Sequence, residues 1–474
     1  MKYDVIVVGG GLGGLTAGAK LALSGKKVLL LEQHDRPGGC ATTFQRGEFT
    51  MEVGLHEMDG LHERDMKLKI FRDLGIMEKV EFLPVPEFYR FINGRRDIVI
   101  PHNPDEAKNI LYQNFPEQKK GVDAYFESVL NARKIASQAA GVPDRSVGDW
   151  LDEIITDEDL KLVLLGNLGY FHDDPYSLSY YYYLNAQGSY YNGRANFIKG
   201  GSQKLSDALA DTITENGGHV KLKNRVSLVE PGHPNRVHYH TSGKKDSVFE
   251  AEAEIVIVNA SLPELAGCLL KDKYGRALTE SIESINIGAS LLTVYFGFNR
   301  ELSEFGCTNY STFVYDESVK TQADILGNNK SDFDTRSFTF VDYGKVDSAL
   351  APEGKSVGAV CCIDYLSDWA GLDRKGYREK KCLAGMQISE RLNKLFPGFE
   401  EAVDYMEVAT AKTVKRYTLN PEGAVYGFAQ NPGASRKYLD LLPENIYLAS
   451  AWGKFGGGFT GAIFSGYMTA LDII

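Results

Sequence analysis

The sequence lacks any apolar run of the length that crosses a lipid bilayer, about 20 residues, and it lacks an excess of basic residues. Its 52 Lys and Arg stand against 63 Asp and Glu, which gives a formal net charge of −11. Because proteins bind nucleic-acid backbones through clustered cations, this balance argues against a nucleic-acid partner. A strand-like apolar run begins at Val5 without a charged and apolar leader before it, so we expect no signal peptide and a cytoplasmic location.

Cysteine is scarce, and no two cysteines have the C-x-x-C spacing of a redox or zinc motif. In a cytoplasmic chain such scattered thiols are expected to be reduced. Cys361 and Cys362 lie in an apolar run, where we expect them to be buried as small hydrophobic residues. His56 and His62 are six positions apart with Gly60 between them, so they would not share one face of a helix as zinc ligands do. The sequence therefore predicts no metal site.

Glycine, in contrast, is abundant, and one group of glycines lies between residues 5–8 (VIVV), typical of a buried strand, and residues 15–22 (LTAGAKLA), typical of a helix. Gly9, Gly11 and Gly14 have the G-x-G-x-x-G spacing of a dinucleotide-binding loop. Such glycines permit a tight turn, approach of the backbone to a pyrophosphate, and close packing of helix on strand, while the first N–H groups of the helix bind phosphate. The loop residues predicted to contact the dinucleotide are Gly9, Gly11, Leu12, Gly13 and Gly14.

A second apolar run, residues 28–31, ends in Glu32, eighteen positions after Gly14. An acidic side chain at this place accepts hydrogen bonds from a ribose in dinucleotide-binding folds. Glu32 and the following Gln33 are therefore predicted to contact the cofactor.

The next residues, Arg36 to Cys40, form an R-x-G-G turn, and residues 47–54 alternate like a strand that ends in glycine. This order resembles flavoproteins of the amine-oxidase and phytoene-desaturase type, in which such a strand runs to the flavin ring. The sequence differs from the usual pattern at Cys40, where many amine oxidases have arginine, and at Glu52, where aspartate is usual. The cofactor contacts that the resemblance implies in the turn are Arg36, Gly38, Gly39 and Cys40.

Later motifs extend the resemblance over nearly the whole chain. Residues 198–205 (IKGGSQKL) resemble the family's glycine turn, and Val226 lies where the family's backbone contacts adenine. Residues 253–260 resemble the strand that returns to the flavin, with Asn259 near its end. A second glycine-rich helix start resembles the segment at the pyrimidine end of the flavin, through Gly457, Gly458, Phe459 and Thr460.

The resemblance implies FAD as cofactor and an α/β fold: a Rossmann-like FAD-binding domain of the glutathione-reductase and amine-oxidase type, interleaved with a substrate domain of antiparallel sheet and helices. We expect the FAD domain to consist of residues 1–75, 190–285 and 405–474, and the substrate domain of residues 76–189 and 286–404. Because only one complete dinucleotide fingerprint is present, no separate nicotinamide site is expected. The elements expected in the substrate domain are helices over residues 104–114, 121–140, 147–165 and 377–395 and strands over residues 291–298, 337–343 and 356–364.

Residues 49–60 (FTMEVGLHEMDG) resemble the retinol-saturase and carotenoid-isomerase branch of these flavoproteins. The resemblance implies an oxidoreductase that acts on carbon–carbon bonds of an apolar isoprenoid, by desaturation, saturation or isomerisation; the electron partner stays open. It also places His56 near the flavin ring, as a proton donor or acceptor or as a histidine satisfied by backbone hydrogen bonds. The tyrosines at 180–183 and 190–191 either line a substrate tunnel or pack in the core.

Two other functions fit the same fold. One is an amine or protoporphyrinogen oxidase, and the other is a non-catalytic carrier of prenyl lipids. The apolar substrate also suggests weak docking on a membrane surface, through Ile70, Phe71, Leu74 and residues 82–83 beside basic residues such as Lys67. Burial of these side chains in the core is the alternative.

Overall fold

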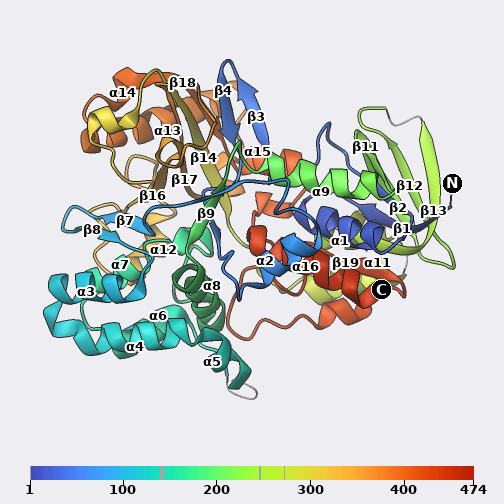
Figure 1. Ribbon diagram of the computed structural model, residues 1–474, viewed down its shortest axis with the longest axis horizontal. Coiled ribbons are helices and arrows are strands. Elements are labelled where there is room, and N and C mark those ends of the chain that lie inside the picture. The colour runs from blue at the N-terminus through green and yellow to red at the C-terminus, as the bar shows by residue number, and fades with distance from the viewer. Residues whose placement is uncertain (1, 139–142, 245–246, 272) are drawn as a thin grey trace.

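A computed structural model describes residues 2–138, 143–244, 247–271 and 273–474. It has two lobes, each built on a seven-stranded sheet (Figure 1). The first sheet has the order β10-β2-β1-β13-β12-β11, and β19 pairs with the second half of β13. The strands β10, β2, β1, β13 and β19 are parallel, whereas β12 and β11 are antiparallel additions. The bounds are β1 (Lys2–Val8), β2 (Val28–Leu31), β10 (His219–Lys221), β11 (Asn224–Glu230), β12 (Asn235–Thr241), β13 (Val248–Val258) and β19 (Ile446–Leu448).

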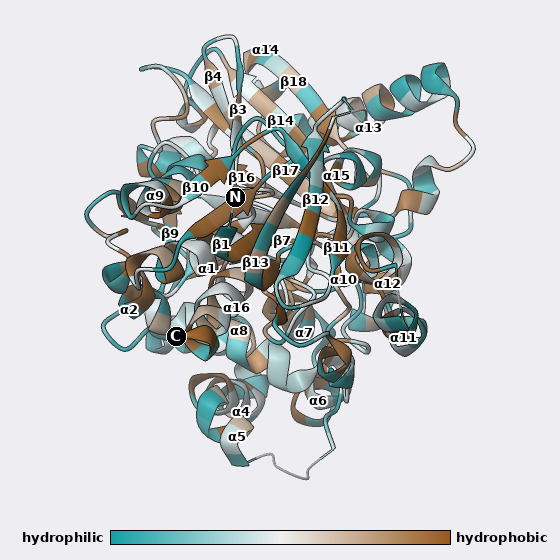
Figure 2. Ribbon diagram, turned by 90° about the vertical axis from the view of Figure 1, so that its right-hand side faces the viewer, coloured by the Kyte–Doolittle hydropathy of each residue, from teal (hydrophilic) through white to brown (hydrophobic). Residues whose placement is uncertain are grey.

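Both faces of this sheet are buried, which explains why its strands are continuous apolar runs rather than alternating ones. In β1, Val5 and Val7 pack on one face, and Ile6 and Val8 pack on the other. The hydrophobic colour of the central strands is visible in Figure 2. Helices α1 (Leu12–Leu23), α9 (Gln203–Glu215) and α16 (Gly458–Ile473) cover the first face, and α10 (Leu262–Glu264) and α11 (Lys273–Ile282) cover the second.

The second sheet has the order β18-β14-β17-β16-β15-β7-β8, and all neighbours are antiparallel except β15 and β7. Helices α13 (Arg374–Leu395) and α14 (Phe399–Ala402) pack on one face of it. The strand expected at residues 356–364 is present with these bounds, and both of its cysteines are buried. The bounds are β7 (Tyr89–Ile92), β8 (Asp97–Ile100), β14 (Ser290–Phe298), β15 (Ser311–Val314), β16 (Phe338–Asp342), β17 (Ser356–Asp364) and β18 (Val403–Ala409).

A group of helices lies below this sheet (Figure 1). The helix expected at residues 104–114 is present as α3 (Pro104–Asn114), but two longer expected helices are each broken. The first one ends at Leu130 and resumes at Ala132, and its expected last residues lie outside the described part of the chain. The second one is interrupted because Ile155 is extended and Asp157 caps a new helix by accepting the Leu160 N–H at 3.0 Å. The bounds are α4 (Lys119–Leu130), α5 (Ala132–Gln138), α6 (Val147–Ile154), α7 (Glu158–Leu164) and α8 (Tyr180–Gly193).

Two small sheets complete the fold. One pairs β3 (Thr43–Arg46) with β4 (Phe49–Glu52), and the other has the order β5-β9-β6. The expected domain boundaries stay a prediction, although β18 runs across the expected division at residue 405. The remaining bounds are β5 (Met58–Asp59), β6 (Phe82–Pro84), β9 (Ala195–Ile198), α2 (Met66–Asp73), α12 (Ile325–Asn328) and α15 (Ala411–Thr418).

The apolar cluster considered for membrane docking belongs mainly to the core. Ile70, Phe71 and Leu74 are at most 2% exposed, and Lys67 is 1% exposed. Only residues 82–83 of this cluster are half-buried. The core interpretation of α2 is therefore right, and membrane association stays a prediction without support from this helix. Within the described residues, no helix has both the length and the apolar character of a membrane span.

Candidate active site and cofactor loops

The first glycine loop has the geometry that a phosphate requires. Gly9 has φ +97°, a left-handed conformation that favours glycine, and Gly11 is the N-cap of α1. A Cβ on Gly13 or Gly14 would lie 2.1 Å or 2.3 Å from a carbonyl oxygen of Ala449 or Gly9, so both positions exclude a side chain. Gly11 supplies no side chain that could cap α1, so the first N–H groups of the helix, including that of Leu12, remain available to an anion.

The R-x-G-G turn packs directly on this loop. The Gly38 N–H donates to the Gly10 carbonyl at 2.7 Å, and a Cβ on Gly39 would lie 3.4 Å from the Gly11 Cα. Arg36 donates from Nη1 to the Thr43 carbonyl at 2.8 Å, which orients the turn. The carbonyl oxygen of Cys40 lies 2.7 Å from where a Cβ on Gly54 would stand, so the turn also touches the end of the glycine-terminated strand segment.

Glu32 closes the other side of the loop. Its carboxylate is buried and accepts the Gly10 N–H at 2.6 Å and the His34 N–H at 2.8 Å. A carboxylate has about four acceptor positions, so these two bonds leave capacity for a ribose hydroxyl. The Asn224 N–H donates to the Glu32 carbonyl at 2.7 Å, which brings β11 and Val226 to this side of the loop. Gln33, next in sequence, donates to the Tyr417 carbonyl at 3.1 Å.

Asn259 joins the glycine loop to the C-terminal strand. With its amide oriented to satisfy both neighbours, its oxygen accepts the Gly11 N–H at 2.9 Å, and its nitrogen donates to the Ala449 carbonyl at 2.7 Å. One side chain thus connects the first glycine loop to the residue that follows β19, eight positions before Gly457 of the second predicted cofactor segment.

The second glycine-rich helix start also lies beside the first. Gly457 is the N-cap of α16 and, like Gly11, offers no side chain to cap its helix. A Cβ on Gly466 would lie 2.1 Å from the Gly13 carbonyl, so α16 and α1 cross in backbone contact. Gly458, Phe459 and Thr460 line a cavity, and Thr460 donates from Oγ1 to Asp59 Oδ1 at 2.6 Å.

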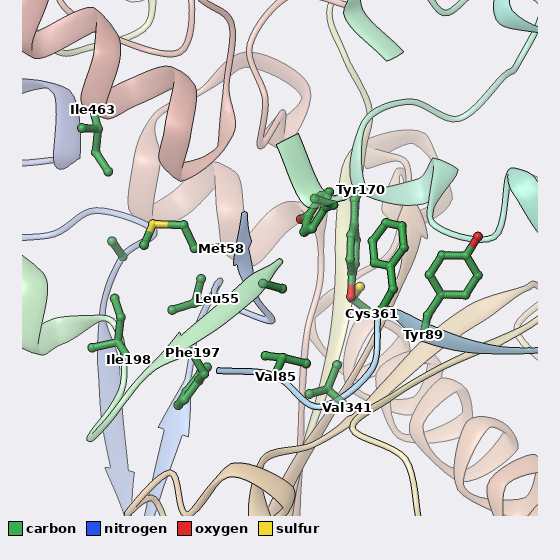
Figure 3. Packing of buried hydrophobic residues seen from close by; sticks show 14 of the residues in the cluster. Leu55, Met58, Val85, Tyr89, Tyr170, Phe197, Ile198, Val341, Cys361 and Ile463 are labelled. Carbon is green, nitrogen blue, oxygen red and sulfur yellow. The ribbon is translucent and has the colours of Figure 1, made fainter. Parts of the chain in front are cut away.

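This cavity has a volume of about 980 Å³ and lies between the two lobes. Its walls come from α8, the end of β5, β14 and β17 of the second sheet, and the start of α16. Tyr170, Tyr190 and Cys361 are buried residues of the wall, and Leu291 of β14 is a half-buried one. Tyr170 and Cys361 lie side by side in Figure 3.

His56 lines the cavity and accepts or donates a hydrogen bond at Nδ1 with the Tyr170 hydroxyl, at 2.9 Å. The Cys361 Sγ lies 3.8 Å from the same nitrogen, and Tyr310 donates its hydroxyl proton to the His56 carbonyl. Burial lowers the pKa of His56 to about 4. The imidazole is therefore neutral near pH 7, and its ring is oriented by a tyrosine hydroxyl rather than by backbone groups.

Glu57 is a cavity residue that sequence reasoning did not single out. Both of its carboxyl oxygens are buried and have no hydrogen-bond partner among the described residues. Burial, followed by the charges of Glu87 and Asp59, raises its pKa well above the ordinary value. Its surroundings therefore favour the protonated, uncharged form of this carboxyl. Its position beside His56 was visible in the sequence, but its burial was not.

A buried ion cluster fixes the floor of the cavity near α16. Lys67 Nζ lies 3.0 Å from Asp59 Oδ2 and 3.3 Å from Asp65 Oδ2, and Ser189 also donates to Asp59. Burial raises the pKa of Asp59, but the Lys67 charge and the hydrogen bonds from Ser189 and Thr460 outweigh it and lower the pKa. Asp59 is therefore ionised and ties α2, α8 and α16 together.

The tyrosines of α8 divide between the two roles considered for them. Tyr181, Tyr182 and Tyr190 line the cavity. Tyr183 is fully buried and donates to the Leu164 carbonyl at 2.7 Å, and Tyr191 packs on Phe88 and Phe126 in the core.

A sequence profile described as "Flavin containing amine oxidoreductase" matches residues 12–474. The chain belongs to this family. It is an FAD-dependent oxidoreductase, and FAD, which supplies hydride transfer when bound, fits the uncapped starts of α1 and α16, two helices in backbone contact at Gly13 and Gly466.

The chain is 26% identical to a chloroplastic prolycopene isomerase of Daucus carota, with 99% of this chain and 79% of that protein covered. It is 25% identical to an all-trans-retinol 13,14-reductase of Danio rerio, over 98% of this chain and 85% of that protein. The resemblance to the phytoene-desaturase, carotenoid-isomerase and retinol-saturase branch of the family is thereby confirmed.

The fold of this amine-oxidoreductase family member is similar to that of putrescine oxidase bound to putrescine, with a TM-score of 0.67 and 16% identity over 100% of this chain and 99% of that one. The expected α/β fold with a Rossmann-like FAD-binding part is therefore confirmed.

Proposed function

We propose that this FAD-dependent oxidoreductase acts on a carbon–carbon bond of an isoprenoid such as a carotenoid or retinoid, by saturation, desaturation or isomerisation. The relatives named above, which act on such molecules by name, support this substrate class. The observation that carries the proposal is the composition of the cavity. Its buried wall joins aromatic and sulfur side chains to one neutral imidazole, His56, and one carboxyl without partners among the described residues, Glu57.

The cofactor contacts in this proposal are the residues of the two glycine loops, the R-x-G-G turn, Glu32, Gln33, Val226 and Asn259. The start of α16 borders the cavity, so a flavin ring bound by α16 would face the buried wall. An extended polyene laid along Tyr170 and Tyr190 would then be aligned against it.

Glu57 is the side chain placed to exchange a proton with the substrate. Burial without hydrogen-bond partners favours the protonated form of Glu57, and a protonated carboxyl donates a proton to carbon more readily than the neutral imidazole of His56, whose pKa is about 4. His56 acts in this proposal as a positioning residue that holds the Tyr170 hydroxyl at the wall.

The test is anaerobic incubation of the holoenzyme with separate carotenoids, retinoids and amines while the visible flavin band is recorded. We expect a polyene to change the band and amines to leave it unchanged. Bleaching by an amine alone would support the amine-oxidase alternative and overturn the proposal. A protein that binds no FAD would support the carrier alternative.

The variant Glu57→Gln separates proton exchange from binding. It removes the exchangeable proton but keeps the shape, so we expect FAD and polyene to bind and turnover to fall by about 100-fold or more. The matched control is Glu87→Gln, a neighbouring carboxyl that does not line the cavity and should keep most of the turnover. Full activity of Glu57→Gln would refute the role of Glu57.

A further inference from the structure

The open end of the cavity is rimmed by cations. Arg64, Arg133, Lys134 and Lys454 line the cavity and are exposed, and Arg436 lines it and is half-buried. An exposed residue that lines a cavity lies at its opening, so Arg64, Arg133, Lys134 and Lys454 lie at the entrance; Arg436 joins them because it bonds to Gly453, next to Lys454. They come from four separate segments of the chain: the loop before α2, helix α5, and two loops between α15 and α16.

None of these five cations forms an ion pair within the described part of the chain. Some exposed cations elsewhere do, such as Arg72 with Glu63 at 2.8 Å and Lys79 with Glu215 at 2.6 Å. The protein as a whole has a net charge of −11, so the positive rim is not a consequence of general basicity.

The acidic side chains that line the cavity do not outnumber its cations. Asp59 and Asp65 share the buried Lys67, and burial without a partner among the described residues favours the uncharged form of Glu57. Asp144 is the remaining acidic residue of the lining; it accepts the Ser179 hydroxyl at 2.5 Å and the Arg145 N–H at 2.9 Å, and among the described residues it forms no ion pair with a rim cation.

Arg436 is held in place at the entrance. Its Nη2 donates to Gln430 Oε1 at 2.8 Å, and its Nη1 donates to the Gly453 carbonyl at 3.0 Å. Gln430 in turn donates to the Phe428 carbonyl at 2.8 Å. These bonds fix the guanidinium beside the segment that carries Lys454, so less side-chain freedom would be lost when an anion binds.

We propose that the cavity takes an amphipathic substrate whose apolar chain lies along the buried wall and whose anionic head, a carboxylate or a phosphate, is bound by these five cations. The placement of the substrate's apolar chain along the buried wall rests on the proposed function. The binding of the substrate's anionic head rests only on the rim cations. A hydrocarbon carotenoid without a head would leave the cations unused, so the substrate class narrows to acidic polyenes and related anionic lipids.

The test compares two ligands with the same carbon skeleton and different heads. All-trans-retinoate and all-trans-retinol are titrated into the oxidised holoenzyme without an electron donor, and binding is followed by quenching of protein fluorescence. We expect retinoate to bind about tenfold more tightly at low salt, and the preference to shrink at high salt because the rim is open to solvent. Equal affinity for the two ligands at low salt would overturn the proposal.

Charge-removal variants locate the effect. Arg133→Gln with Lys134→Gln should weaken retinoate binding by about five- to tenfold and leave retinol binding unchanged. The matched control is Lys119→Gln with Lys120→Gln, an adjacent exposed pair on α4 that does not line the cavity, and it should change neither. Equal losses in both double variants would show a non-specific charge effect and refute the assignment.

Sedimentation with vesicles of phosphatidylserine and phosphatidylcholine distinguishes a substrate head from a membrane headgroup. If the Arg133 and Lys134 changes abolish sedimentation but leave retinoate affinity intact, the rim serves a membrane and the proposal is wrong. The anaerobic incubation described under the proposed function is independent of these outcomes. Turnover of a polyene without a preference for retinoate would refute only the proposal about the anionic head. A preference for retinoate without turnover of any polyene would refute only the proposed carbon–carbon chemistry.

Discussion

Replacing Lys67 by methionine should destabilise the protein by about 3–5 kcal/mol, because it leaves buried carboxylates without their cation. Lys67 is 1% exposed, its two partners lie at 3.0 and 3.3 Å, and Asp65 is 3% exposed. Methionine keeps the length and apolar stem of lysine, so the loss is one of charge rather than of volume.

The effect depends on pH, and its sign follows from Asp59. In the wild type its pKa is lowered, so its contribution to stability is present at neutral pH and is lost as the pH falls through that value. In the variant, burial acts without the cation and raises the pKa above that of the unfolded chain, so stability falls as the pH rises. The difference between wild type and variant should therefore be largest near pH 8 and shrink toward about pH 5.

The measurement is a thermal unfolding curve that is monitored by the release of flavin. Flavin release reports on this site because Asp59 also accepts a hydrogen bond from Thr460 at the start of α16. With an unfolding entropy of about 2.1 cal/mol/K per residue, unfolding of the whole chain as one unit converts the loss into a Tm decrease of about 3–5 °C. The matched control is Lys69→Met, an exposed lysine of the same helix, which should shift Tm by less than about 1 °C. A Lys67→Met shift that equals the control and does not vary with pH would refute this account of the ion cluster.

Three further outcomes are expected. Gly11→Leu should abolish the visible flavin band, because a Cβ there would lie 2.7 Å from the side-chain amide of Asn259; Gly267→Ala, where a Cβ meets nothing within 4 Å, should keep it. Calorimetry should show no stoichiometric NADH or NADPH site in the FAD-loaded protein, and tight binding of either would contradict the single fingerprint. Because the pKa of His56 is about 4, the pH profile of kcat/KM should have no inflection from this residue between about pH 5.5 and 8, and removal of such an inflection by His56→Gln would contradict the neutral imidazole.

Sequence patterns predicted correctly those helices and strands whose bounds are set by neighbouring residues in the sequence. Strand β17 and helix α3 have the expected bounds, because one is a continuous apolar run and the other begins with Asn103 as a cap and Pro104 in its first turn. The break between α6 and α7 was missed because the helical spacing of apolar residues continues across it. The break is caused by Asp157, whose side chain caps the start of α7. The glycine loops were found because their spacing is itself the structural requirement.

The cavity was far less predictable, because burial and convergence are tertiary properties. Nothing near Glu57 in the sequence shows that its carboxyl lacks partners. The rim cations lie near residues 64, 133, 436 and 454, and only the fold brings them to one entrance. In α2 the pattern of apolar and basic residues is compatible with a helix that lies on a membrane and with one that packs in the core. In the structure the apolar side chains of α2 pack in the core.

The parallel sheet has a consequence for the timing of folding during synthesis. Strand β19 completes the edge of β13, yet 188 residues separate Val258 of β13 from Ile446 of β19. At about 5–20 residues per second, the ribosome needs roughly 10–40 s to make that interval. Through this period β13 has an unpaired edge, and the first glycine loop waits for the segment that Asn259 will bind to it. The nascent chain is thus most prone to aggregation before it can bind flavin, and the supply of FAD can rescue only chains whose synthesis has already passed α16.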